Sequence, residues 1–335
     1  MRNRVWVPLL LGLILFSSAG RAHSQNLPSV QISIDMWVGF GPWVLGKEKG
    51  FFEKRGVKLD PVIITGTGEK NAAMAAKRVQ GRAEGLDSIV LAGNQGIPGV
   101  VVLAVDESMG GDGIVATREI RTIADLRGKK VGFQSGLPGH FFLLYLLHKA
   151  GMTEADISPQ IMDSASAGSA FLAGKLDAAV TWEPWLSRAA RRAGAHLLAS
   201  TRENPGVIVD VLALQPEFVR DHPHEVEEIL LGWFDAVEFW KKKPAEANAI
   251  MARFFKIPIG EFTDLLQGVR FSDQERNRQL IGTARNPGKL YEVGEAAGQI
   301  WREAGVLRDP PKPIQQLIDV SVCERLVNQN QPISH

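Results

Sequence analysis

Cysteine is almost absent from this sequence, and so are the short motifs that mark common enzymes. Cys323 is the single cysteine in 335 residues, so no disulfide can form within the chain. The patterns of zinc peptidases, serine hydrolases, thiol redox centres and P-loops (HExxH, GxSxG, CxxC and GxxxxGKS/T) do not occur. His222 and His224 form a His-x-His pair, but the Asp and Pro around them favour a helix start. We therefore predict no enzyme, no catalytic residue, no metal and no cofactor.

An excess of charge of one sign is also absent. The chain has 38 basic and 37 acidic residues, which give a formal net charge of +1. Without an excess of basic residues there is no overall field to attract nucleic acid or an acidic membrane surface. We expect no nucleic-acid partner.

A hydrophobic run long enough to span a bilayer is missing as well. The run from Val5 to Phe16 has about twelve residues, against the roughly twenty that a membrane helix needs. It follows a short basic start and precedes small residues up to Ala22 and Ser24, which is the layout of a secretory signal peptide. We expect residues 1–24 to be removed and the mature protein to lie in the periplasm. The alternative is an uncleaved membrane anchor.

The whole sequence has 45% hydrophobic and 22% charged residues, which is ordinary for a globular protein, and the part after the predicted signal peptide is long enough for two compact lobes. Strand and helix patterns alternate along it, as a mostly parallel α/β sheet requires. Besides the opening segment, we expect strands over 100–105, 130–133, 178–182 and 197–199, and helices over 70–79, 141–150, 184–193, 222–243, 244–255 and 290–303.

The opening segment, residues 32–64, predicts a strand, a loop, an amphipathic helix and a second strand. The helix ends in Lys54-Arg55-Gly56, where basic residues and glycine are favoured. The loop rich in glycine and tryptophan lies at the carboxyl end of the first strand. Open α/β sheets usually bind their ligands at that edge.

Four stretches, in this order, carry a resemblance to a known family: GKEKGFFEKRGVKLDPV at 46–62, VVLAVDESMGGDGIVAT at 101–117, IADLRGKKVGFQSGLPG at 123–139 and GKLDAAVTWEPWLSRA at 174–189. The chain resembles the periplasmic solute-binding proteins of ABC transporters of the nitrate, sulfonate, taurine and bicarbonate type. This group includes relatives that bind a thiamine pyrimidine precursor.

The resemblance implies an α/β type II periplasmic-binding-protein fold, with two lobes of mixed, mostly parallel sheets joined by a two-segment hinge. Residues 27–115 and 212–335 would form an outer lobe and residues 116–211 an inner lobe, with crossings near Ile114–Thr117 and Asp210–Leu214. It also implies a monomer that closes on a small-molecule ligand and delivers it to a permease in the inner membrane.

Candidate ligand contacts come from the loops expected at the cleft. Trp37, Phe40 and Trp43 would form an aromatic wall, although at least one tryptophan could instead belong to the core. Thr67 and Gly68 begin a helix whose N–H groups could hold an anion, but capping alone would favour the same residues.

The later loops add further candidates. Ser135 and Gly136 precede a second helix and could donate hydrogen bonds. Trp182 and Glu183 end a strand before Pro184, a favoured first residue of a helix. Glu183 could therefore contact ligand or only favour that helix start. Asp112, between glycines, could meet the ligand or serve as a turn residue.

The ligand class remains divided between two alternatives. Helix starts and hydroxyl groups would suit a sulfonate, nitrate or taurine-like anion. Three acids (Asp35, Asp112 and Glu183) and several aromatic rings are better matched to an amine, amidine or pyrimidine-like compound. Lys70 is the nearest cation, and we expect it to point away from the cleft. Other possible functions are a ligand sensor and, less favoured with one distant cysteine, an enzyme resembling a pyrimidine-precursor synthase.

Overall fold

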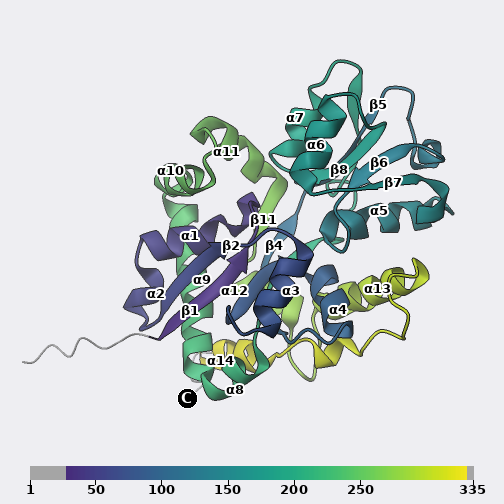
Figure 1. Cartoon of the computed structure of the whole chain (residues 1–335). Helices are drawn as coiled ribbons and strands as arrows, with labels where there is room; N and C mark the ends of the chain where they lie inside the picture. The colour runs from purple at the N-terminus through teal and green to yellow at the C-terminus, as the bar shows by residue number, and fades with distance from the viewer. Residues whose placement is uncertain (1–27, 330–335) are drawn as a thin grey trace, which may run out of the picture.

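The computed structural model describes residues 28–329, and the predicted signal peptide lies outside this range. Two mixed sheets divide the described chain into two layered lobes (Figure 1). The first sheet has the strand order β11 (Val269–Phe271), β4 (Val100–Ser108), β10 (Val209–Leu214), β3 (Gly81–Gly85), β1 (Ser29–Ile34) and β2 (Lys58–Ile63). The second has the order β7 (Ser158–Ile161), β6 (Lys130–Phe133), β8 (Ala178–Trp182), β5 (Asp112–Thr117) and β9 (Ala195–Ser200).

The prediction of a two-lobed α/β fold with mixed sheets is confirmed, but the sheets are not mostly parallel. In the first sheet β1 pairs in parallel with β2 and β3, whereas β10 runs antiparallel to β3 and β4. In the second sheet β6 is parallel to β7 and β8, whereas β5 runs antiparallel to β8 and β9. The strands by which the chain enters one lobe and returns to the other provide most of the antiparallel pairings.

Helices cover both faces of each sheet, as the labels in Figure 1 show. Around the first sheet they are η1 (Val38–Phe40), α1 (Gly41–Glu48), α2 (Phe51–Lys54), α3 (Thr67–Ala75), α4 (Leu86–Asn94), α8 (Pro216–Asp221), α9 (Pro223–Lys242), α10 (Pro244–Phe255), α11 (Ile259–Leu265), η4 (Leu266–Gly268), α12 (Gln274–Ile281), α13 (Lys289–Glu303), η5 (Ile314–Gln316) and α14 (Ser321–Gln329). Around the second they are η2 (Ile123–Leu126), α5 (Pro138–Lys149), η3 (Glu154–Asp156), α6 (Ser164–Leu172) and α7 (Trp185–Ala190). No helix within residues 28–329 combines the length and apolar character needed to cross a membrane.

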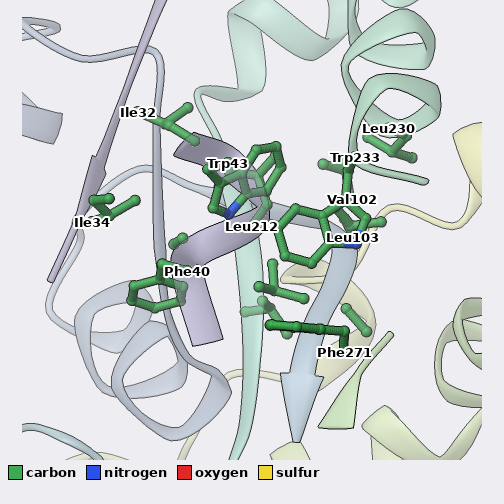
Figure 2. Packing of buried hydrophobic residues seen from close by; sticks show 14 of the residues in the cluster. Ile32, Ile34, Phe40, Trp43, Val102, Leu103, Leu212, Leu230, Trp233 and Phe271 are labelled. Carbon is green, nitrogen blue, oxygen red and sulfur yellow. The ribbon is translucent and has the colours of Figure 1, made fainter. Parts of the chain in front are cut away.

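The largest hydrophobic core lies between the first sheet and the helices α1, α9 and α10. Trp43 and Trp233 meet at its centre with their rings 4.5 Å apart, as Figure 2 shows among the surrounding strand residues. Gly46 and Gly232 allow Phe52 to insert between α1 and α9, because a Cβ at either glycine would lie within 2.5 Å of its ring. This packing fixes α1, and with it the loop that follows β1.

Two sequence predictions need correction. The segments predicted as crossings, Ile114–Thr117 and Asp210–Leu214, belong to β5 and β10, since their apolar residues are buried in the sheets. The chain instead passes between the sheets at residues 109–111 and 201–208. The predicted helix after the first loop is interrupted before Gly50, which has a φ of +66° and separates α1 from α2.

Candidate ligand-binding site

A small cavity lies between the two sheets, with a volume of about 30 Å³. The first sheet contributes Asp35, just beyond β1, together with Glu84 of β3 and Asp210 of β10. The second contributes Asp112 and Trp182, which pair directly across β5 and β8. The other lining residues are Trp37, Phe40, Gly85, Pro138 and Ile208. Because both sheets supply part of the wall, a molecule in this cavity would contact both lobes.

Trp37 is held in place on the wall of the cavity. Its Nε1 donates to the two carboxyl oxygens of Asp106 at 3.2 and 3.4 Å. Gly39 and Gly111 make room for it, since a Cβ at either position would lie 2.2 to 2.3 Å from an atom of the indole. The loop glycines recognised in the sequence therefore allow close packing around this ring.

The indole of Trp182 enters the cavity from the end of β8. Its Nε1 is buried and has no hydrogen-bond partner. Phe40 completes an aromatic part of the wall with the two tryptophans. Aromatic faces attract flat or positively charged groups, the latter through the negative potential above the ring.

Lys70, the nearest lysine, does not point away from the cavity as the sequence analysis expected. Its side chain is fully buried, its Nζ lies 2.9 Å from Glu84 Oε1, and it also pairs with Asp35. Burial by itself would lower the pKa of Lys70, but Asp35 and Glu84 outweigh burial, so the pKa lies above its usual value. Lys70 is therefore a charged structural partner of two lining carboxylates.

Four further carboxyls in and around the cavity have no cationic partner among residues 28–329. Burial raises the pKa of Asp112 to about 7, and the neighbouring Glu183 contributes to the rise. Burial likewise raises the pKa of Asp106 to about 8, against the opposing effect of the bond from Trp37. The pKa of Asp87 rises to about 8, also through burial. For Asp210 burial and then the charges of the other aspartates raise the pKa well above its usual value.

Four of the ten residues predicted to contact ligand meet around this cavity: Trp37, Phe40, Asp112 and Trp182. They come from the loop after β1, from η1, from the start of β5 and from the end of β8. Parallel strands place their carboxyl ends at one sheet edge, and the antiparallel β5 presents its first residue there. The chain thus brings these four together as the strand order requires.

Trp43 lies elsewhere, and its prediction as a wall residue is corrected. It is fully buried in the first core, with Trp233 on one side and Phe52 on the other. The helix periodicity explains this: α1 begins at Gly41, and Trp43 points inward from its first turn toward α9. Of the two tryptophans in this loop region, Trp43 is the core residue that the sequence analysis allowed for.

Glu183 turns away from the cavity toward its own helix. Its carboxylate accepts hydrogen bonds from the backbone N–H of Ser187 at 3.1 Å and from the hydroxyl of the same residue at 2.6 Å. It lines a separate depression near Arg191 and Arg202. The sequence left open whether Glu183 contacts ligand or stabilises the start of its helix, and in the structure it bonds to that helix.

The remaining four predicted residues lie outside the cavity lining, and Thr67, Ser135 and Gly136 lie where the two lobes touch. Thr67 Oγ1, at the start of α3, donates to the backbone oxygen of Ser135 at 3.2 Å. Gly136 has a φ of +74°, and a Cβ there would lie 3.6 Å from Thr67. Gly68 has open space at its Cβ position. These helix starts therefore connect the lobes in this structure.

Comparison with known families decides the wider assignment. Residues 37–247 match the family described as NMT1/THI5 like, which is more than half of the chain. The chain belongs to this family. The matched residues include the whole second sheet, strands β2, β3, β4 and β10 of the first sheet, and every cavity-lining residue except Asp35, so the resemblance seen in the sequence is confirmed.

Proteins that are similar to this chain are named as binding proteins. A Brucella abortus (strain 2308) protein named only as a binding protein is 26% identical over 261 residues, which cover 77% of this chain and 80% of the relative. The taurine-binding periplasmic protein of Escherichia coli (strain K12) is 23% identical over 220 residues, 63% of this chain and 68% of the relative. The solved alkanesulfonate-binding protein SsuA of Xanthomonas axonopodis pv. citri, bound to MOPS, has a TM-score of 0.73 at 19% identity and covers 87% of this chain and 98% of its own. The similarity to SsuA shows that the two proteins share a fold.

Several lining residues were missed by the sequence analysis. Glu84 and Gly85 belong to β3, a strand that was not predicted because its sequence, GRAEG, has low strand propensity. Asp210 was assigned to a crossing, although an acid inside the apolar run VIVDVLAL was a signal of a buried polar site. Pro138 and Ile208 adjoin predicted elements but carried no pattern of their own, whereas Asp35 was already one of the three acids considered as partners of a cationic ligand.

Proposed function

We propose that this protein is the extracytoplasmic solute-binding component of an ABC importer. It captures a small organic solute, a sulfonate, nitrate or taurine-like anion or an amine, amidine or pyrimidine-like compound, and delivers it to a permease in the inner membrane. The observation that carries the proposal is the cavity lined from both sheets in a member of a family whose relatives are named for solute binding. The signal-like start supports a periplasmic location.

Two lobes can couple binding to a change of shape. We assign residues 28–111 and 209–329 to one lobe and 112–208 to the other, with the segments 109–111 and 201–208 as the hinge. A solute that contacts Asp210 on one lobe and Trp182 on the other stabilises the closed arrangement. The bond from Thr67 to Ser135 is then one of the contacts made on closing. The permease would distinguish the closed monomer from the open one.

The experiment combines binding with transport. The exported protein is screened by thermal shift against sulfonates, nitrate and bicarbonate in one panel and amines, amidines and pyrimidines in another, because a ligand specific to the folded state raises the melting temperature. Small-angle X-ray scattering then measures whether the hit reduces the radius of gyration, and mass spectrometry whether the hit is recovered unchanged. Uptake of the hit by cells lacking the gene should fall and return on complementation.

Two results would contradict the proposal. Chemical conversion of the hit would mean an enzyme, and binding with normal uptake in the deletion strain would move the assignment to a ligand sensor.

A further inference from the structure

We propose that the solute of this cavity is a small organic cation with N–H donors, a primary ammonium or an amidinium group. The inference rests on the proposed function, because it names the ligand class of the same cavity. It begins with the composition of the wall. The lining residues include four acids and no lysine, arginine or histidine; the acids are Asp35, Glu84, Asp112 and Asp210.

The protein's own cations near the cavity are already used. Lys70 is buried between Asp35 and Glu84, and Arg82 Nη1 lies 3.4 Å from the second oxygen of Glu84. Within residues 28–329 neither Asp112 nor Asp210 takes part in an ion pair, although both are at least 95% buried. A buried carboxyl either stays protonated, as the hydrogen bond between Asp106 and Asp210 allows in the ligand-free protein, or is ionised beside a cationic partner. A bound ammonium or amidinium would supply it.

An unsatisfied acceptor lies directly behind the wall. Asp87 is 2% exposed, and while its Oδ2 accepts a hydrogen bond from Ser88, its Oδ1 has no partner. A Cβ added to the lining residue Gly85 would lie 2.4 Å from this Oδ1. The oxygen thus lies beside a wall position that carries no side chain. A ligand N–H reaching that position would satisfy an acceptor that the protein leaves unpaired.

The same wall offers few donors to an anion. Trp37 Nε1 is bonded to Asp106, and the backbone N–H of Asp112 is bonded to Ser108 Oγ at 3.1 Å. Trp182 Nε1 is a buried donor without a partner, but a sulfonate or nitrate needs several donors or a cation around its oxygens. The ring faces of Trp37, Phe40 and Trp182 suit a cation as well as the carboxyls do.

A metal ion fits this wall less well than an organic cation. In the described part of the chain no group of three or more His, Cys, Asp or Glu side chains is placed to hold a metal. An organic cation needs no such convergence, because its N–H groups and its apolar body can contact the carboxyls and the rings separately.

The test uses the full exported protein and defined probes at pH 8. Butylamine and benzamidine present N–H donors on a cation, and tetramethylammonium is a cation without them. Methanesulfonate, taurine and nitrate are the anionic headgroups, and 2-aminopyrimidine is a neutral heteroaromatic. We expect butylamine or benzamidine to raise the melting temperature and to give a measurable Kd by calorimetry, and the anions to do neither.

Matched variants then locate the charge. Asp210→Asn keeps the shape of the side chain and removes its charge, and should weaken cation binding by about tenfold or more, the equivalent of one charge-assisted hydrogen bond. Asp309→Asn removes an exposed carboxylate away from the cavity and should leave the Kd unchanged. Circular dichroism checks that both variants fold. The Kd of Trp182→Phe is a second measurement, because this variant removes the Nε1 and keeps an aromatic ring.

The outcomes separate the inference from the function on which it rests. If methanesulfonate, taurine or nitrate binds, and binds more tightly to Asp210→Asn, the inference of a cationic ligand is wrong. The proposed solute-binding function would still stand. Binding of 2-aminopyrimidine alone, or of tetramethylammonium as tightly as butylamine, would also overturn the inference. No shift with any probe refutes the stated class, whereas the proposed importer fails only if no solute closes the lobes or depends on the protein for uptake.

Discussion

Replacing Asp112 with asparagine is the most direct test of the electrostatics of the cavity. Its side chain is buried at the start of β5, near Asp106, Asp210 and Asp87, and the charge of Glu183 also acts on it. Replacing it with asparagine keeps the shape and removes the charge. Because Lys70 and Arg82 are paired with Asp35 and Glu84, no cation of the described chain compensates an ionised Asp112.

The sign of the effect follows from the raised pKa. In the unfolded chain Asp112 loses its proton near its usual pKa of 3.8, and in the folded protein only near pH 7. Between these values the folded state binds more protons, so its stability falls as the pH rises. The pKa rises by about three units and each unit is about 1.36 kcal/mol, so an ionised Asp112 costs the ligand-free protein up to roughly 4 kcal/mol above pH 7.

The assay is urea denaturation of ligand-free wild-type and Asp112→Asn protein at intervals from pH 4 to pH 8.5. We expect the variant to equal the wild type near pH 4 and to become progressively more stable than it toward pH 8. Asp309→Asn, which changes an exposed carboxylate, should show no pH-dependent difference. A stability difference for Asp112→Asn that is constant with pH, or that grows as the pH falls, would refute the charge cluster as described.

Three further predictions concern single side chains. Lys70→Met leaves two buried carboxylates without their cation and should lower the free energy of unfolding by about 3 to 5 kcal/mol, measured by denaturation; an unchanged midpoint would contradict the ion pairs. Trp182→Ala should weaken ligand binding by roughly 1 to 3 kcal/mol in calorimetry, whereas Trp43→Ala should instead lower stability by about 3 to 5 kcal/mol; the reverse pattern would exchange their roles. Glu183→Gln should leave the Kd of the ligand within about twofold, because the carboxylate of Glu183 is bonded to Ser187 of its own helix and does not line the cavity, and a large loss of affinity would return Glu183 to the site.

The sequence predicted the local elements best where one pattern dominated. The strands β6 and β8 and the helix α10 have the predicted bounds, since their apolar periodicity and flanking turns agree. It failed at β3 and at β11 with α12, which were not predicted at all. The polar strand β3 is stabilised by β1 and β10 on its two sides and by the ion pair of Glu84 with Lys70, and all three of these partners lie outside the strand's own sequence.

The candidate site shows the same division. Loop position near the ends of strands was enough to predict that Trp37, Phe40, Asp112 and Trp182 lie together, because these ends collect at one edge of a sheet. Position in the sequence did not predict the orientation of Trp43 or Glu183, because the helix that each one begins determines which way its side chain points.

The order of residues was sufficient for the family, the alternation of strands and helices, and the aromatic and acidic residue types available for binding. The electrostatics of the cavity, in contrast, depend on how the folded chain packs. This packing buries Lys70 against two carboxylates and places Asp210 beside three other aspartates from distant segments. Charge balance in a low-dielectric interior depends on distances of a few ångströms between residues far apart in the chain, and local patterns contain no information about them.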